Sequence, residues 1–252
     1  MASASTGLRL GMRESNIDAS KGADEELDRI VGQIREAWPE VEILVRGDSG
    51  FCRESLMTWC EEHHVDYLFG IAKNSRLKQE LEPEMAEARR QYEETGKASR
   101  VFKDFRYKTL ETWSRERRVI GKAEHLEKGS NPRFVVTSLS AEDYDARQVY
   151  EEQYCIRGDM ENRIKEQQLD LFADRTSSFT MRANQLRLYF SCLAYLLMSE
   201  LRRRGLQRTQ FAKAQCHTIR LKLLKIGAQI RLSVRRVYVS LSIPGGVSTN
   251  PR

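Results

Sequence analysis

Apolar residues in the first part of the chain alternate between helical and strand-like spacing. Over residues 24–38 they recur every three or four positions, which predicts a helix with one apolar face. Residues 41–45 form a short apolar run typical of a buried strand, and a turn over 46–51 follows it. A second helix over 54–64 and a second strand over 65–72 repeat the order. This rhythm predicts an α/β sheet.

The pattern changes in the middle of the chain. Residues 75–96 are charged and favour helix, with a break near Pro83. Strand-like stretches then follow at 101–107, 113–120 and 134–139. Because these strands succeed one another without intervening helices, they predict a mostly antiparallel portion joined to the first sheet.

Helical spacing returns in the last part of the chain. It predicts helices over 141–171, 181–204 and 213–226 and a final strand over 229–241. The helix over 181–204 is apolar on nearly all sides, which predicts that it is buried in a core. The remaining residues, 242–252, predict a disordered tail.

Charge is distributed unevenly. The 252 residues carry a net charge of +6, but all 36 Asp and Glu residues precede position 201, and twelve of the 42 Lys and Arg residues follow position 200. Such a basic end favours a polyanionic partner, above all nucleic acid. The alternative is a basic surface that contacts only solvent.

Composition excludes several classes of protein. At 40% hydrophobic and 31% charged residues, the chain is neither collagen-like nor wholly disordered. The longest apolar run, 188–198, is about half of the roughly 20 residues that cross a bilayer, so no membrane association is expected. Five cysteines without a CxxC pair or a secretory signal predict reduced thiols and a cytoplasmic protein.

Polar residues form a stripe on the helix predicted to begin near Ala141. At about 100° per residue the members share one face, and an apolar stripe beside them would pack on a core. The stripe contains Tyr154, Arg157, Glu161, Lys165 and Gln168. The apolar stripe contains Val149, Ile156, Met160, Ile164 and Leu171. A plain ladder of ion pairs would also produce the polar spacing.

Asp48 is the candidate counterpart of this stripe. It directly follows an apolar strand, where α/β sheets place their ligand sites, although it also suits a turn. Carboxylates brought together without His or Cys would form an all-oxygen site of the kind that Mg²⁺ prefers. Two such ions serve phosphodiester chemistry.

Several segments carry a resemblance to a known family. Tyr154-x2-Arg157-x3-Glu161 resembles the Y-R-E-K signature of bacterial insertion-sequence transposases with a DDE triad. The flanking sequences resemble the insertion-sequence thirteen-eighty group from about Ser15 to about Val239. They are RGDSGF at 46–51, VDYLFGIAKN at 65–74, YCIRGDMENRIKEQQLDLFADRTS at 154–177 and RANQLRLYFSCLAYLL at 182–197.

The resemblance implies a fold and an activity. It implies an RNase H-like catalytic core that cleaves transposon ends and joins them to target DNA, with Mg²⁺, or Mn²⁺ in its place. By position, Asp48 corresponds to the second acid of the triad and Glu161 to the third, and both would bind metal. Tyr154 and Arg157 correspond to positions near DNA phosphates. The intact family implies a homo-oligomer.

The chain departs from the family pattern in two places. The signature has a Lys separated from the Glu by six residues, and this chain has Gln168 at that position. Lys165 would then take the phosphate-facing role. No residue matches the first acid, which implies an N-terminally truncated, weakly active or inactive catalytic fragment. The alternative is a non-catalytic DNA- or transposase-binding fragment that regulates transposition. The early aspartates lie in a lead-in or on an amphipathic helix: Asp18, Asp24 and Asp28.

These observations divide the chain into four parts. We expect a partial RNase H-like core over 1–74 with the second acid and a mixed insertion over 75–139. The rest of the core, with the last acid and a basic portion, would span 140–241, and the tail 242–252. Two groups of basic residues are expected to contact DNA. The first is Arg202, Arg203 and Arg204; the second is Arg115, Arg117 and Arg118 around Trp113.

Overall fold

A computed structural model describes residues 18, 20–225 and 227–241. The expected tail at 242–252 lies outside these residues. The chain divides into two compact units: a sheet unit, Glu14–Asp159, and a C-terminal unit that begins at Met160. Each unit is described separately below. No helix in the described parts of the chain is both long and apolar enough to span a bilayer.

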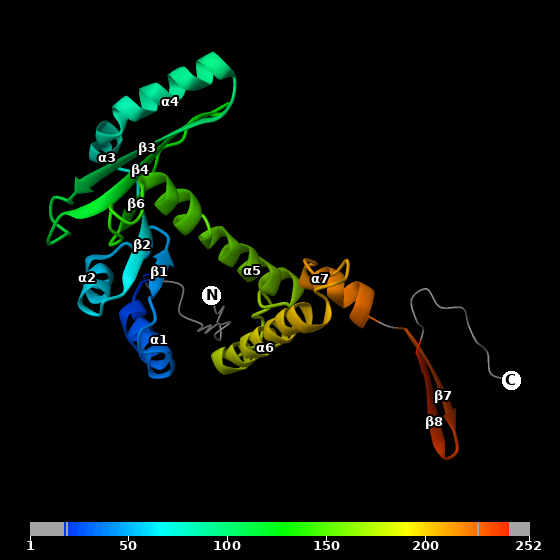
Figure 1. Ribbon diagram of the computed structural model, residues 1–252. Helices are drawn as coiled ribbons and strands as arrows, with labels where there is room; N and C mark the ends of the chain where they lie inside the picture. The colour runs from blue at the N-terminus through cyan, green and yellow to red at the C-terminus, as the bar shows by residue number, and fades with distance from the viewer. Residues whose placement is uncertain (1–17, 19, 226, 242–252) are drawn as a thin grey trace. The chain divides into compact units, whose positions relative to one another are not determined.

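The sheet unit is built on one mixed sheet (Figure 1). The two strands β1 and β2 are parallel, and every other neighbouring pair is antiparallel, as the strand-rich middle of the sequence predicts. In sheet order the strands are β1 (Leu44–Gly47), β2 (Asp66–Ile71), β6 (Arg133–Thr137), β4 (Arg117–Leu126) and β3 (Ser99–Tyr107), with the short β5 (Gly129–Ser130) paired to β4.

The strand register determines which chain ends meet. Gly47 at the end of β1 pairs with Phe69 of β2, so both strands end at one edge of the sheet. Strand β6 runs in the opposite direction and begins there, because its Phe134 pairs with Ile71. We call this the carboxyl edge. The loop after β1, the loop after β2 and the start of β6 therefore lie together.

Four helices cover one face of the sheet. Odd-numbered residues of β2, Tyr67 and Phe69, are fully buried against them, as are Leu77 and Leu81 of the helices. Figure 1 shows the last of these helices along the chain, residues 82–95, alongside β3 and β4. The helices are α1 (Ala23–Ala37), α2 (Glu54–Glu62), α3 (Ser75–Glu80) and α4 (Glu82–Thr95). Pro83 lies in the first turn of α4, where proline is tolerated, so the predicted break is confirmed.

The opposite face packs on a single helical segment, η1 (Gln148–Tyr154). Leu68 of β2 and Val135 of β6 contact its buried residues Val149 and Tyr150. This segment is a π-helix, in which the Cys155 N–H bonds to the Tyr150 carbonyl five residues earlier. The sheet is thus enclosed on both faces.

Trp113 and two of the three basic residues near it are internal, contrary to the DNA-contact hypothesis, whereas Arg115 is exposed and pairs with Glu61. Trp113 is 5% exposed and cannot stack on a base. Arg117 is buried between Glu54 and Glu61 of α2, at 2.6 and 2.8 Å. Arg118 binds Asp104 and three backbone carbonyls. Trp113 precedes β4 rather than beginning it, because its ring packs against Tyr107.

The helix predicted over 141–171 is not continuous. The π-helix η1 ends at Tyr154, a turn occupies residues 155–156, and α5 (Arg157–Asp170) then begins. The prediction that the polar stripe lies on one face assumed a rotation of about 100° per residue along one continuous α-helix. A π-helical turn followed by a break changes this rotation, so the assumption does not hold. Tyr154 therefore belongs to a different helical segment from the rest of the stripe.

The C-terminal unit is helical, with a terminal hairpin. Its helix α6 (Met181–Gly205) confirms the predicted span, but not the predicted burial, because Leu186, Phe190 and Leu193 are more than half exposed. The core of the unit contains Tyr195, Met198, Leu206, Cys216 and Ile219. The remaining elements are α7 (Cys216–Ile219), η2 (Arg220–Leu224), β7 (Ala228–Ser233) and β8 (Arg236–Leu241).

Two boundaries in this unit differ from the sequence prediction. The helix expected over 213–226 spans only α7 and η2. The single strand expected over 229–241 is a hairpin, in which Ser233 pairs with Arg236 across a two-residue turn. Apolar residues alternate on both sides of the turn, but the alternation changes phase at Arg235 and Arg236, and the single-strand prediction overlooked this signal.

Candidate functional site

Asp48 lies at the carboxyl edge, one residue after β1. Its Oδ1 accepts a hydrogen bond from the Gly50 N–H at 2.8 Å, and its carbonyl accepts one from the Phe51 N–H at 3.1 Å. The predicted turn is therefore confirmed. The side chain is exposed, and Oδ2 has no hydrogen-bond partner among the described residues. One oxygen fixes the carboxylate while the other faces outward.

The strand that leads to Asp48 is held by close packing. A Cβ at Gly47 would lie 2.9 Å from Phe51 Cβ and 3.0 Å from Phe69 Cδ1. A side chain at this position would push the turn away from β2. Glycine therefore keeps the backbone of the Asp48 turn close to the neighbouring strand.

Tyr154 reaches the same place from η1. A Cβ at Gly70 of β2 would lie 2.6 Å from Tyr154 Oη, 3.3 Å from Ser49 N and 3.6 Å from Asp48 C. The phenol hydroxyl and the Asp48 turn thus meet above Gly70, which only a glycine leaves open. The sequence indicated Asp48 as a metal ligand and Tyr154 as a residue near DNA phosphates, but it gave no sign of the glycine that brings the two together.

A side-chain hydrogen bond secures η1 beside this turn. Arg46 Nη2 of β1 donates to Gln153 Oε1 at 2.9 Å. Burial lowers the pKa of Arg46, and its Nε is buried without a partner among the described residues. The ring of Tyr154 also contacts Tyr150, with centroids 5.5 Å apart. Gln153 and Tyr154 together hold the end of η1 against the carboxyl edge.

The other predicted stripe residues lie in the C-terminal unit. Glu161, Lys165 and Gln168 are exposed on α5. The side chain of Arg157 lies outside the described part of the chain. Asp48 belongs to the sheet unit and Glu161 to the C-terminal unit, so the pairing of these two carboxylates stays a prediction.

The apolar stripe predicted beside these residues is confirmed for Val149, which is buried, and for Leu171, which packs on the core of the C-terminal unit, but it is wrong at two positions. Ile156 is 48% exposed and Met160 is 46% exposed. The side chain that α5 buries is Gln167, whose Nε2 donates to Cys192 Sγ of α6 at 3.2 Å. A polar residue with a partner in its own unit thus replaces the expected apolar contact, which hydrophobic spacing cannot reveal.

The arginines at the end of α6 differ in their surroundings. Arg202 is largely buried, and its guanidinium bonds to Glu166 of α5 and to Cys216 Sγ. Arg203 and Arg204 are exposed, and both pair with Glu200 one turn earlier. Arg202 therefore joins two helices of its unit, whereas DNA contact by Arg203 and Arg204 stays a prediction.

The carboxyl edge suits a hard divalent cation. Mg²⁺ commonly binds one or two protein carboxylates together with phosphate oxygens of the substrate. Asp48 offers an outward-facing carboxylate oxygen of this kind. Over residues 18, 20–225 and 227–241, no three His, Cys, Asp or Glu side chains come together as a metal-binding group. Any further ligands would come from Glu161 or from DNA.

Comparison with known proteins identifies the family. A search of curated proteins finds no match to the chain. The family model described as "Transposase DDE domain group 1" matches residues 5–245, which is nearly the whole sequence. Both the Asp48 turn and α5 lie inside the match. The chain therefore belongs to the DDE transposase domain family, group 1.

Proposed function

We propose that this chain carries the DNA-cleaving site of an insertion-sequence transposase, with Asp48 and Glu161 as its catalytic carboxylates. One observation carries the proposal: the backbone turn that holds Asp48 and the Tyr154 hydroxyl meet above Gly70 at the carboxyl edge of the sheet. The family match gives the substrate class, DNA. The mixed sheet suits the RNase H-like core that the resemblance to the thirteen-eighty group implies.

The reaction is a substitution at phosphorus. Water attacks a phosphodiester, a new P–O bond forms, the bond to the 3′ oxygen breaks, and that oxygen leaves with a proton as a 3′-hydroxyl. The hydroxyl then attacks a phosphodiester of the target strand in the same manner. Asp48 and Glu161 would hold divalent cations, whose chemistry when bound would be to activate the attacking oxygen and to stabilise the leaving oxygen.

The residues of the chain position this reaction. Asp48 and Glu161 would hold the cations, and the Gly50 N–H fixes the direction of the Asp48 carboxylate. The Tyr154 hydroxyl lies beside the backbone of the Asp48 turn and would donate a hydrogen bond to a phosphate oxygen. Arg157, which follows Tyr154 by three residues in the sequence, would supply positive charge toward the phosphate.

Nicking of supercoiled DNA in Mn²⁺ tests the proposal. Asp48→Asn removes the charge but keeps the shape, and we expect it to reduce nicking at least about a hundredfold, as loss of a group that stabilises transition-state charge does. Asp66→Asn is the matched control, because Asp66 begins β2 at the opposite edge of the sheet and accepts a hydrogen bond from Ser138 Oγ.

Two outcomes would contradict the proposal. Equal nicking by the unaltered chain and Asp48→Asn would assign the activity to another site or a contaminant. Salt-sensitive DNA binding without any nicking would instead identify the alternative, a binding module that regulates transposition.

A further inference from the structure

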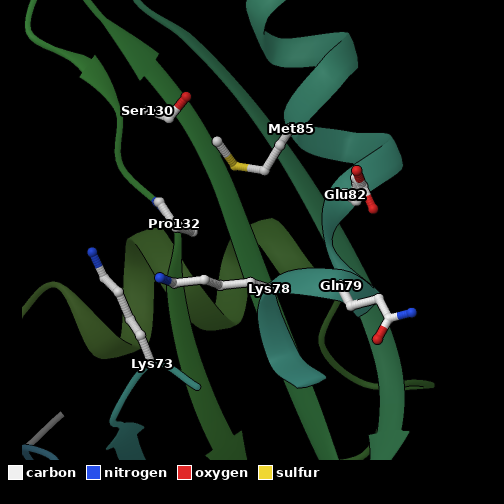
Figure 2. A pocket seen from close by; sticks show the side chains of 7 residues that line it. All are labelled: Lys73, Lys78, Gln79, Glu82, Met85, Ser130 and Pro132. Carbon is white, nitrogen blue, oxygen red and sulfur yellow. The ribbon is translucent and has the colours of Figure 1, made fainter. Parts of the chain in front are cut away.

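Two lysines, Lys73 and Lys78, line a pocket at the carboxyl edge of the sheet. The pocket has a volume of about 560 Å³ and is lined by Lys73, Lys78, Gln79, Glu82, Met85, Ser130 and Pro132. Figure 2 shows the ammonium groups of Lys73 and Lys78 on the Pro132 side of the pocket. Glu82 also lines it, with its carboxylate on the far side from both ammonium groups.

Arg133 adds a third charge to this group. It begins β6, and the register that pairs Phe134 with Ile71 places Arg133 beside the end of β2, just before Lys73. The pKa of Lys73 is lowered, first by partial burial and then by the nearby charges of Arg133, Lys78 and Lys122. Of these, Lys122 is neutralised by Glu124 at 2.7 Å.

The cations of this unit differ in their partners. Arg100, Arg115, Arg117 and Arg118 all pair with carboxylates. In contrast, Lys73, Lys78 and Arg133 are exposed and form no ion pair with any residue that the structure describes. Like charges gathered without counter-ions cost free energy, and an anion bound among them would remove that cost.

The group is continuous with the Asp48 turn. Arg133 pairs in register with Lys122 of β4, whose ammonium lies 5.3 Å from the centre of the Tyr150 ring. The ring of Tyr150 contacts Tyr154, whose hydroxyl meets the Asp48 turn above Gly70. A row of neighbouring groups therefore runs along the edge from Lys78 to Asp48.

We propose that Lys73, Lys78 and Arg133 bind the phosphate backbone of the DNA strand whose scissile phosphate lies at Asp48. This inference rests on the proposed function and extends it, because it gives the path of the strand beyond the reacting phosphate. Cations that contact phosphates fix the register of DNA on a protein without reading its sequence. The cluster therefore sets which phosphate reaches Asp48 and not which base.

Salt-dependent DNA binding by the full chain tests this inference. The probe is a short fluorescein-labelled duplex of arbitrary sequence, and the slope of log K against log salt concentration is measured. In the double variant Lys73→Ala/Lys78→Ala we expect the slope to become shallower by about 2, which is about 1 per lost phosphate contact. Adding Arg133→Ala is expected to reduce it by about 1 more.

Two matched variants control for net charge and folding. Arg89→Ala/Arg90→Ala removes the same charge from exposed α4 residues that pair with Glu93 and Glu87, and it should leave the slope unchanged. Lys73→Arg/Lys78→Arg keeps the charge and should restore the slope. Unchanged tryptophan fluorescence would show that each variant is folded.

The possible failures are distinguishable. If the unaltered chain binds DNA and the Lys73/Lys78 variant has the same slope, the phosphate path is overturned and the proposed function stands. If the Arg89/Arg90 variant loses as much slope, net charge alone explains binding and the path is again overturned. If the unaltered chain does not bind DNA, both proposals fall.

Discussion

The two units of this chain bury their apolar residues to different extents. In the sheet unit, Tyr67, Leu68 and Phe69 of one strand are all at most 1% exposed, and helices or η1 cover both faces. In the C-terminal unit, Leu193 and Leu197 of α6 are 53% and 64% exposed. The sheet unit also buries two arginines, Arg117 and Arg118, with carboxylate partners.

This difference shows where the stability of the chain resides. The sheet unit buries its apolar residues and pairs the buried Arg117 and Arg118 with carboxylates, so a single change in its interior should be costly. All three tryptophans, Trp38, Trp59 and Trp113, lie in this unit. Tryptophan fluorescence therefore reports unfolding of the sheet unit alone, which gives a way to test the contrast.

The largest effect is expected for Arg117→Ala. The change leaves Glu54 and Glu61 facing each other without the buried guanidinium, and losing one partner of a buried ion pair costs about 3 to 5 kcal/mol. Urea unfolding followed by tryptophan fluorescence measures this loss. Arg115→Ala is the control, because Arg115 pairs with the same Glu61 from an exposed position and should cost about 1 kcal/mol or less. Equal losses would contradict the account.

Acid should destabilise the sheet unit over a defined range. Burial opposes ionisation of Glu124, but hydrogen bonds from Lys122, Arg100 and Asn131 outweigh it and lower its pKa to about 2. A carboxyl whose pKa is lower in the folded state stabilises the fold above its ordinary value of 4.5. This stability is lost as the pH falls from about 5 to about 2.

The variant Glu124→Gln separates this carboxyl from the others. We expect it to lower the free energy of unfolding at neutral pH by about 1.5 to 3 kcal/mol, the range for hydrogen bonds to charged groups. Its unfolding free energy should also vary less between pH 5 and pH 2 than that of the unaltered chain. If the unfolding free energies of the variant and of the unaltered chain changed equally between pH 5 and pH 2, the acid sensitivity would belong to other groups.

A smaller effect is expected for Gly70→Ala. The new methyl group would lie 2.6 Å from Tyr154 Oη, so we expect a loss of about 1 to 2 kcal/mol, since the contact is with the end of one side chain. Adding Tyr154→Phe removes that oxygen and should recover part of the loss. A double-mutant cycle with no coupling would show that Tyr154 does not pack on Gly70.

The smallest effect is expected on α6. Leu193→Ser replaces an exposed leucine, and the tryptophan-monitored free energy of unfolding should change by less than about 0.5 kcal/mol. Binding of the apolar dye ANS should decrease. A loss comparable to that of Gly70→Ala would show that Leu193 is covered and that the contrast between the units is overstated.

Local patterns in the sequence predicted the fold of the sheet unit well. The spacing of Val31 and its neighbours predicted α1, and the apolar runs predicted β1 and β2. The β1 run itself begins later than expected, at Leu44, because Val41 is exposed before the strand pairs. Such elements are determined by which residues become buried, and burial follows hydrophobic spacing.

Other features could not be predicted because they depend on contacts between distant residues. The π-turn of η1 is accompanied by the bond between Arg46 and Gln153, 107 positions apart. The position of Tyr154 depends on a glycine in another strand. Asp48 was identified from its place after a strand, but Arg133 was missed, because only the register of β6 brings it to the same edge.

The central claim is that Asp48 and Glu161 hold divalent cations together on DNA. Mn²⁺ binding in the presence of a short duplex, followed by loss of the free-ion EPR signal, tests this directly. We predict that Asp48→Asn and Glu161→Gln each weaken binding at least about tenfold. Asp159→Asn, about 200° around α5 from Glu161, should leave binding unchanged. Binding that depends on Asp48 but is unaffected by Glu161→Gln would contradict the claim.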